Sequence, residues 1–146
     1  MKALLQRVKQ ASVKIDDNLY SSIGFGLLIF LGIEKFDEKI NAEKLAEKVL
    51  KLRIFEDENE KMNLSVSDVQ GEILVVSQFT LCGDCKKGTR PSFDNSAPLD
   101  KANELYEYFV DCLKNTSGLN IQTGKFRACM DVSLVNDGPV TFMIEK

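Results

Sequence analysis

The sequence predicts an α+β fold: a mostly antiparallel, barrel-like β-sheet with two main helices. Many short segments show the period-2 alternation or the apolar runs of strands, whereas only two segments have helical periodicity. Strand and helix do not alternate strictly, which argues against a doubly wound parallel sheet. The chain has 146 residues, 44% of them apolar, with no internal repeat or linker. We therefore expect residues 1–146 to form a single domain.

The first half of the chain is predicted to contain mainly strands. Residues 12–15 alternate between polar and apolar side chains, which is typical of a half-buried strand, and apolar residues within 4–8 place its start earlier. The continuous apolar run 27–31 predicts a strand covered on both faces. Residues 73–76 predict another buried strand, and residues 53–55 a short one.

Two segments are predicted to be helices. In the first, Asp37 is a candidate N-cap, and apolar positions at i, i+3 and i+4 define one buried face. In the second, Pro98 suits the first turn, and residues 115–118 end the helix. The apolar positions are Ala42, Leu45, Ala46, Val49 and Leu50 in the first helix and Leu99, Ala102, Tyr106, Phe109, Val110 and Leu113 in the second.

The last part of the chain is predicted to form two strands with a break between them. Apolar and polar residues alternate over 126–134, and the strand pattern resumes over 140–144. Residues 136–139, with the sequence Asn-Asp-Gly-Pro, interrupt it. Because proline fixes its own φ and donates no hydrogen bond, Pro139 marks an edge, a bulge or a kink, and a plain turn is the alternative.

The composition excludes several kinds of catalyst and location. No histidine is present, which excludes Ser-His-Asp and Cys-His catalysis and His-ligated metals, and we expect neither a metal nor another cofactor. With a net charge of -3, the chain is not a polycation, so any contact with nucleic acid must come from a local patch. The longest apolar stretch, residues 25–33, is shorter than the ~20 residues of a membrane span, and no signal peptide is evident. We expect a cytoplasmic protein that does not contact a membrane.

The four cysteines include one C-x-x-C pair, Cys82 and Cys85. A zinc ribbon would need a second pair, and a redox pair would need a thioredoxin-like strand-to-helix context. The pair is instead followed by a predicted loop, so ordinary reduced thiols are the simpler interpretation. A redox or metal-binding protein remains the alternative, and it would require these two thiols to form a disulfide or to bind a metal.

The end of the predicted strand 73–76 is a candidate site. Ser77, Gln78, Phe79 and Thr80 place hydroxyl and amide groups around one aromatic ring, and backbone N–H groups are free where strand pairing stops. Such groups can fix a small substrate. The alternative is a strand that frays into a loop with ordinary polar residues.

Two small basic groups are candidate phosphate contacts. Lys86, Lys87 and Arg90 share one predicted loop, and Lys125 and Arg127 lie close together further along the chain. Loops of this kind can bind phosphates. Most surface lysines bind nothing, so solvated loops are the alternative.

Several motifs along the whole chain resemble those of one protein family. The longest are Val75-Val76-Ser77-Gln78-Phe79-Thr80-Leu81, Gly88-Thr89-Arg90-Pro91-Ser92-Phe93 and Val135-Asn136-Asp137-Gly138-Pro139-Val140-Thr141-Phe142. Shorter ones are Gln6-Arg7-Val8, Ala11-Ser12-Val13, Gly26-Leu27-Leu28, Leu31-Gly32-Ile33-Glu34-Lys35, Arg53-Ile54-Phe55 and Lys61-Met62-Asn63-Leu64. In this order and at this length they resemble the D-aminoacyl-tRNA deacylase family, and the main departure is the loop with Cys82 and Cys85.

The resemblance implies a homodimeric hydrolase that cleaves the ester between a D-amino acid and the 3′ end of tRNA. It also implies release of glycine mischarged onto tRNA. Residues 77–80 would line the pocket, with the basic loop as a candidate tRNA contact. Gly138 and Pro139 would form a Gly-cisPro element, supplied by the partner subunit, that faces the aminoacyl group and excludes L side chains.

The lack of histidine shapes the expected mechanism. Thr80 has no strong base to activate its hydroxyl, so we expect it mainly to position the substrate. Backbone N–H groups of residues 78–80 would polarise the ester carbonyl, and the terminal 2′-OH of tRNA would help to activate water.

A second interpretation is a non-catalytic RNA-binding module that uses Phe79, Phe93 and the basic loops on a β surface. The net charge of -3 and the absence of a basic aromatic strand signature count against it.

Overall fold

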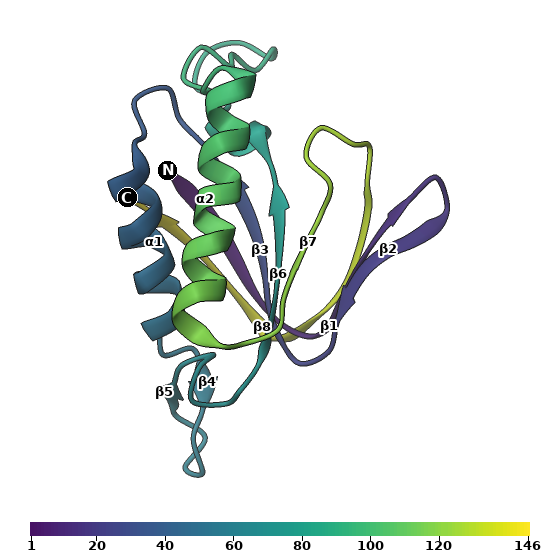
Figure 1. The fold of residues 1–146 in the computed structure, drawn as a ribbon, viewed down its shortest axis with the longest axis vertical. Helices are drawn as coiled ribbons and strands as arrows, with labels where there is room; N and C mark the ends of the chain where they lie inside the picture. The colour runs from purple at the N-terminus through teal and green to yellow at the C-terminus, as the bar shows by residue number, and fades with distance from the viewer.

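A curved, six-stranded β-sheet carries two helices on one of its faces (Figure 1). This is a computed structural model, and it describes residues 1–146. The elements are β1 (Lys2–Ile15), β2 (Asn18–Ile23), β3 (Gly26–Gly32), α1 (Lys39–Lys51), β4 (Phe55–Glu56), β5 (Met62–Leu64), β6 (Glu72–Ser77), the 3₁₀ helix η1 (Phe79–Cys82), α2 (Leu99–Ser117), β7 (Ile121–Thr123) and β8 (Asp131–Glu145). None of the helices is both long and apolar enough to cross a membrane.

The sheet is mostly antiparallel and nearly closed. β1 pairs antiparallel with β3, with β2 and with β8, while β3–β6 and β6–β7 are parallel pairs. β2 also packs against β6 and β7, and the Ser21 hydroxyl donates a hydrogen bond to the Thr123 carbonyl at 2.8 Å. The predicted α+β class with a barrel-like sheet and two main helices is therefore confirmed.

Alternating side chains of the central strands enter two separate cores. Leu27 and Ile29 of β3 belong to a large cluster that includes residues of both helices, whereas Leu28 belongs to a smaller cluster enclosed by the curled sheet. The side chains of β6 divide between the same two clusters. The predicted strands 27–31 and 73–76 are thus confirmed, and both are buried on their two faces.

The start of α1 differs from the prediction because the Asp37 carboxylate has another role. Glu38, not Asp37, is the N-cap, and its N–H donates to Asn41 Oδ1 at 2.9 Å. The Asp37 carboxylate is buried and accepts hydrogen bonds from the Glu34 N–H at 2.6 Å and from the Met1 ammonium group at 2.5 Å. Tertiary contacts therefore displace the helix start from the predicted N-cap.

The second helix begins and ends close to the predicted positions. Pro98 is the N-cap of α2, just before the first turn. Gly118 follows the last helical residue with a φ of +66°, a conformation that favours glycine and ends a helix.

The C-terminal strand differs from the prediction in two ways. The predicted strand 126–134 begins only at Asp131, since the preceding residues form a loop in which Arg127 has a φ of +64°. Residues 136–139 do not separate two strands, because β8 continues through them with a bulge. The bulge interpretation of Pro139 is confirmed, and the plain turn is wrong.

The hairpin that contains β2 was not predicted, because most side chains of β2 are polar or exposed. Asp16 and Asp17 form its tight turn with φ values of 49° and 60°, as two-residue hairpin turns require. The predicted short strand at 53–55 is found slightly later, at Phe55–Glu56.

Candidate active site

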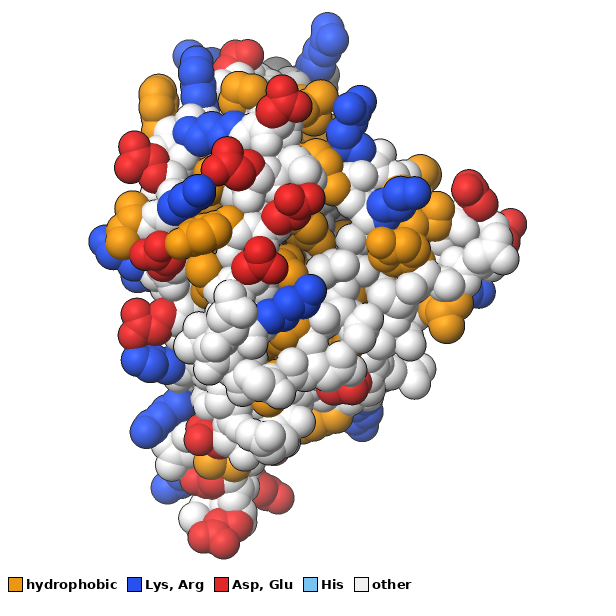
Figure 2. Space-filling model, in the orientation of Figure 1, with side chains coloured by type: hydrophobic (Ala, Val, Ile, Leu, Met, Phe, Trp, Pro, Cys, Tyr) orange, Lys and Arg blue, Asp and Glu red, His pale blue; other side chains and the backbone are white.

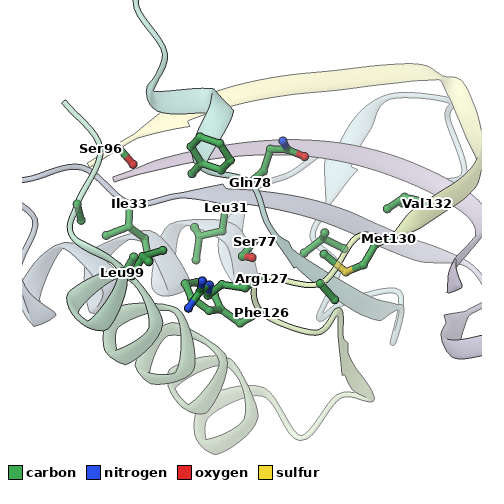
Figure 3. A pocket seen from close by; sticks show the side chains of 15 residues that line it. Leu31, Ile33, Ser77, Gln78, Ser96, Leu99, Phe126, Arg127, Met130 and Val132 are labelled. Carbon is green, nitrogen blue, oxygen red and sulfur yellow. The ribbon is translucent and has the colours of Figure 1, made fainter. Parts of the chain in front are cut away.

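A cavity of about 420 Å³ opens between the end of β6, the start of α2 and the segment after β7 (Figure 3). Its lining is mainly hydrophobic, and the polar side chains in it are Ser77, Gln78, Ser96 and Arg127. An apolar cavity of this size with a few polar groups is typical of a small-ligand site. It is the candidate active site of this chain.

The end of β6 is fixed against β3 by one hydrogen bond and one close approach. The Gln78 N–H donates to the Leu31 carbonyl at 2.8 Å. η1 then crosses close to Gly32, where a Cβ atom would lie only 3.0 Å from Leu81 Cβ and 3.1 Å from Cys82 Sγ. Glycine at this position lets the chain turn sharply after β6, which places the next residues at the cavity.

Three of the four residues expected to be catalytic line the cavity. Ser77 lies near the middle of the lining residues and Gln78 lies close to it (Figure 3), and Phe79 also lines the cavity. The Phe79 ring is 59% exposed and lies 5.0 Å from the Phe93 ring. Thr80 does not line the cavity, but its hydroxyl oxygen accepts a hydrogen bond from the Gln78 side-chain amide.

The strand end also offers free backbone donors. Phe79 and Thr80 are the first residues of η1, so their N–H groups have no partner within that helix. The first bond of this turn is made by the Leu81 N–H, which donates to the Gln78 carbonyl at 3.2 Å. Two neighbouring N–H groups thus lie next to the polar side chains of the cavity.

The opposite wall contains Phe126, which the sequence pattern did not mark as part of a site, and Arg127, which it marked only as a candidate phosphate contact. Phe126 and Arg127 lie in the loop between β7 and β8, and both line the cavity. The Tyr106 ring of α2 lies 5.9 Å from the Phe126 ring, and its hydroxyl donates to the Val75 carbonyl at 2.8 Å. Burial raises the pKa of Tyr106, so this phenol stays protonated and acts as a structural donor. Of the two residues predicted as a second basic group, Arg127 lines this cavity and Lys125 does not, and their contact with phosphate stays a prediction.

Gly138 and Pro139 lie in β8 and do not line the cavity of their own chain. The peptide bond between them is cis. Gly138 has a φ of +132°, and a Cβ atom there would lie 2.6 Å from Val140 Cγ2. No residue with a side chain fits this position without a local shift.

The bulge of β8 stands opposite a single residue of β1. Gln6 and Val8 both pair with β8, and the β8 residues between their partners are the four at 137–140. On β1, only Arg7 lies between the two pairs. β8 therefore has three more residues than β1 at this point, and its segment 137–140 loops out at Arg7.

Arg7 is buried under this bulge and binds three separate acceptors. It is 4% exposed. Its guanidinium donates from Nε to the Asp137 carbonyl at 3.1 Å, from Nη1 to the Ile54 carbonyl at 2.8 Å, and from Nη2 to Glu56 Oε1 at 3.3 Å. Arg7 thus fixes the bulge relative to the end of α1 and β4. In the sequence, the only pattern that distinguishes Arg7 is a positive charge within a segment predicted to be a strand.

Asn136 holds the bulge from within β8. Its Oδ1 accepts a hydrogen bond from the Val140 N–H at 2.7 Å, and its Nδ2 donates to Thr141 Oγ1 at 3.0 Å. One side chain therefore links the two ends of the looped-out segment.

The sequence and the fold both match known proteins. A family model described as D-Tyr-tRNA(Tyr) deacylase matches residues 4–145. The chain belongs to this family. The D-aminoacyl-tRNA deacylase of Thermodesulfovibrio yellowstonii is 58% identical over 144 residues, which cover 99% of this chain and 98% of that protein.

Two solved structures extend the match to three dimensions. A protein titled c-Myc DNA Unwinding Element Binding Protein is 44% identical, with a TM-score of 0.95 over 100% of this chain and 99% of that one. A probable eukaryotic D-amino acid tRNA deacylase shares the fold at 17% identity, with a TM-score of 0.87 over 99% of this chain and 98% of that one. The predicted resemblance to the deacylase family is confirmed.

The basic loop of this family member lies apart from the cavity. Lys86, Lys87 and Arg90 are exposed in the loop between η1 and α2, and none of them lines the cavity. Lys86 contributes instead to a separate surface depression, together with Cys82 and Cys85. Their contact with tRNA stays a prediction.

Cys82 of the C-x-x-C pair has the features of an ordinary buried thiol. All four cysteines are free. Cys82 is buried, its thiol donates to the Ile33 carbonyl at 3.4 Å, and burial raises its pKa. Because the thiolate is the reactive form, a raised pKa makes Cys82 a poor nucleophile. Cys85 is exposed.

Proposed function

We propose that this chain hydrolyses the ester that joins a D-amino acid, or mischarged glycine, to the 3′ end of tRNA, and that it leaves L-aminoacyl esters intact. The observation that carries the proposal is the apolar cavity at Ser77, Gln78 and Phe79 in a member of the D-Tyr-tRNA(Tyr) deacylase family. A cavity of about 420 Å³ suits the aminoacylated 3′ end of tRNA, which combines a purine nucleoside with an aminoacyl group.

The reaction needs activated water and stabilised charge on the carbonyl oxygen. A water oxygen bonds to the ester carbonyl carbon, the bond from that carbon to the 3′ oxygen breaks, and one proton passes from the water to the leaving oxygen. The N–H groups of Phe79 and Thr80 polarise the carbonyl. With no histidine in the chain, the neighbouring 2′-OH of tRNA helps to orient and activate the water.

Thr80 acts in this scheme as a positioning residue. Its hydroxyl oxygen accepts a hydrogen bond from the Gln78 side chain and has no base next to it. A hydroxyl without a base is a poor nucleophile at neutral pH. The bond holds the Gln78 amide in place beside the cavity.

We propose a homodimer because β8 presents an open edge with apolar side chains. β8 has 15 residues and pairs only with β1. Val135, Phe142 and Met143 of this strand are 44%, 40% and 49% exposed. Long open edges with apolar side chains are normally covered. We propose that a second copy of the chain covers this edge.

The partner subunit then supplies the element that excludes L substrates. Gly138 and Pro139 lie away from the cavity of their own chain, which supports a role in the cavity of the other subunit. A backbone wall beside Cα that leaves room for hydrogen and not for Cβ rejects every L residue, whatever its side chain. Glycine has no Cβ and escapes this rejection.

Contacts with the rest of tRNA are proposed for Lys86, Lys87 and Arg90, and the site of action is proposed to be the cytoplasm. These three side chains form no ion pair and are free to bind phosphate. The expected affinity is modest and sensitive to salt.

The proposal is tested by incubating the purified protein with D-tyrosyl-tRNA and following the release of D-tyrosine. Release that is abolished by a 2′-deoxy 3′ end supports the scheme. A folded protein that binds the tRNA without releasing the amino acid would instead support the non-catalytic RNA-binding module.

A further inference from the structure

A second groove lies next to the active-site cavity. It has a volume of about 280 Å³ and lies between α2, β7 and the β1–β2 hairpin. We call it the hairpin groove and define it by Tyr20, Tyr106, Glu107, Lys114, Lys125 and Phe126. In Figure 2, hydrophobic side chains are exposed beside α2, with both basic and acidic side chains around them.

The hairpin groove and the active-site cavity share one wall. Phe126 lines both, and the consecutive α2 residues Ala102 and Asn103 line the cavity and the groove respectively. Two contacts of Tyr106 fix this wall. Its hydroxyl donates a hydrogen bond to the Val75 carbonyl at 2.8 Å, and its ring packs against the Phe126 ring. A chain that enters the cavity can therefore continue past Phe126 into the groove.

The side chains of the groove suit nucleotides better than phosphate alone. Tyr20 is 49% exposed and offers a ring face on which a base can stack. Lys114 and Lys125 are exposed and form no ion pair, so they can neutralise backbone phosphates. Glu107 and Asp111 also line the groove. Carboxylates would repel a free phosphate, but they accept hydrogen bonds from the exocyclic amino group of cytosine.

We propose that the hairpin groove binds the single-stranded nucleotides that precede the terminal adenosine of tRNA. The inference rests on the proposed function and extends it from the ester to the tRNA strand. The base of the penultimate nucleotide stacks on the Tyr20 side of the groove, and Lys114 and Lys125 bind the phosphates.

The test compares a long and a short substrate. D-tyrosyl-tRNA reaches both cavity and groove, whereas D-tyrosyl-adenosine fills the cavity alone. We expect Tyr20→Ala to lower kcat/KM for D-tyrosyl-tRNA by at least about fivefold, as expected for one lost stacking contact. Lys125→Ala should reduce the slope of log kcat/KM against log salt concentration by about 1. Both variants should hydrolyse D-tyrosyl-adenosine at the unaltered rate.

The chain offers matched controls. Lys114→Ala should reduce the salt slope by about as much as Lys125→Ala, about 1. Lys48 and Lys114 are both exposed lysines in the last turn of a helix, so Lys48→Ala is the control for Lys114→Ala. Leu19 precedes Tyr20 in β2, is 63% exposed and does not line the groove, so Leu19→Ala controls for Tyr20→Ala. Tyr20→Phe keeps the ring and should restore most of the rate on tRNA.

Three results would overturn the proposal. Equal losses on both substrates would show that the groove residues act only through the cavity. Unchanged kinetics on D-tyrosyl-tRNA would show that tRNA does not enter the groove. If the unmodified protein hydrolyses neither ester, the proposed function fails, and the groove proposal fails with it.

Discussion

Arg7 and Asp137 join β1 to β8 where β8 bulges away from its neighbour. The Arg7 Nε donates a hydrogen bond to the Asp137 carbonyl oxygen at 3.1 Å and lies 3.2 Å from Asp137 Oδ2, so the guanidinium hydrogen-bonds the backbone of Asp137 and forms an ion pair with its side chain. Gly138 follows directly, and its Cβ position would lie 3.3 Å from Arg7 Nη2. The shape of the segment that we propose to face the partner's substrate thus depends on a residue 130 positions away.

Replacing Arg7 should destabilise the protein. Arg7→Ala leaves the Asp137 and Ile54 carbonyls without their donor, and we expect a loss of about 3 kcal/mol in the free energy of unfolding. Urea denaturation measures this loss. Arg7→Lys should recover little, because one ammonium group cannot reach all the acceptors of a guanidinium.

Lys9→Ala is the matched control for Arg7→Ala. Lys9 also approaches Asp137, at 3.9 Å, but its side chain is 68% exposed, so its removal should cost less than about 0.5 kcal/mol. Equal losses for the two variants would contradict the account of the bulge.

A methyl group at Gly138 should distort the bulge. Gly138→Ala must place an L residue at a φ of +132° with its Cβ only 2.6 Å from Val140 Cγ2, and we expect a cost of about 3 kcal/mol. Thermal unfolding measures this cost, and hydrolysis of L-tyrosyl-tRNA should rise relative to that of D-tyrosyl-tRNA.

Gly88→Ala separates the backbone effect from the steric one. Gly88 also has a positive φ, +69°, but nothing lies within 4 Å of a Cβ there, so we expect a cost of only about 1 kcal/mol. If Gly138→Ala lowers the free energy of unfolding no more than Gly88→Ala does, the close approach of the added Cβ to Val140 does not destabilise the protein.

Removing the Thr80 hydroxyl should leave much of the activity. Thr80→Ala deletes the acceptor for the Gln78 side chain but no base-activated nucleophile, so single-turnover hydrolysis of D-tyrosyl-tRNA should persist. A tRNA with a 2′-deoxy 3′ end should be inert toward the unaltered protein. An inactive but folded Thr80→Ala variant, together with turnover of the 2′-deoxy substrate, would reverse the two roles.

Glu72 should make stability depend on pH under acidic conditions. Its carboxylate accepts hydrogen bonds from the Gly24 N–H and from Asn120 Nδ2, and the Gly24 bond is the main cause of its lowered pKa. A carboxyl whose pKa is lower in the folded state stabilises the fold above its ordinary pKa of 4.5, and this stabilisation is lost as pH falls through the lowered value.

The difference in Tm between the unaltered protein and Glu72→Gln should therefore shrink as pH falls below 4.5. Glu58→Gln serves as the control, because Glu58 is exposed and accepts no hydrogen bond. A Tm difference for Glu72→Gln that stays constant down to pH 3, about the lower limit for such scans, would exclude this linkage.

The elements that were predicted correctly are those whose sequence of apolar and polar residues is determined by which side chains are buried. Residues 27–31 and 73–76 are apolar throughout because each strand faces a core on both sides. The hairpin strand β2 was missed because its side chains, Tyr20 among them, are largely exposed and carry no such pattern. The alternation of apolar and polar residues also predicted that the last strand begins at Phe126. The Phe126 side chain lines the cavity instead.

The candidate site was predictable only where it is local in sequence. Ser77, Gln78 and Phe79 are consecutive residues at a strand end, so their polarity after a buried run was visible. Phe126 joins them only through the packing of the β7–β8 loop against α2. Arg7 reaches the bulge through the pairing of β1 with β8, which no local pattern encodes.

The central claim is chiral ester hydrolysis by a site without histidine. The most direct measurement is the hydrolysis of matched D-tyrosyl-, L-tyrosyl- and glycyl-tRNA by the purified protein under identical conditions. We predict release of D-tyrosine and glycine while the L-tyrosyl ester stays intact. Equal rates for the D and L esters, or inertness of a folded protein toward all three, would contradict it.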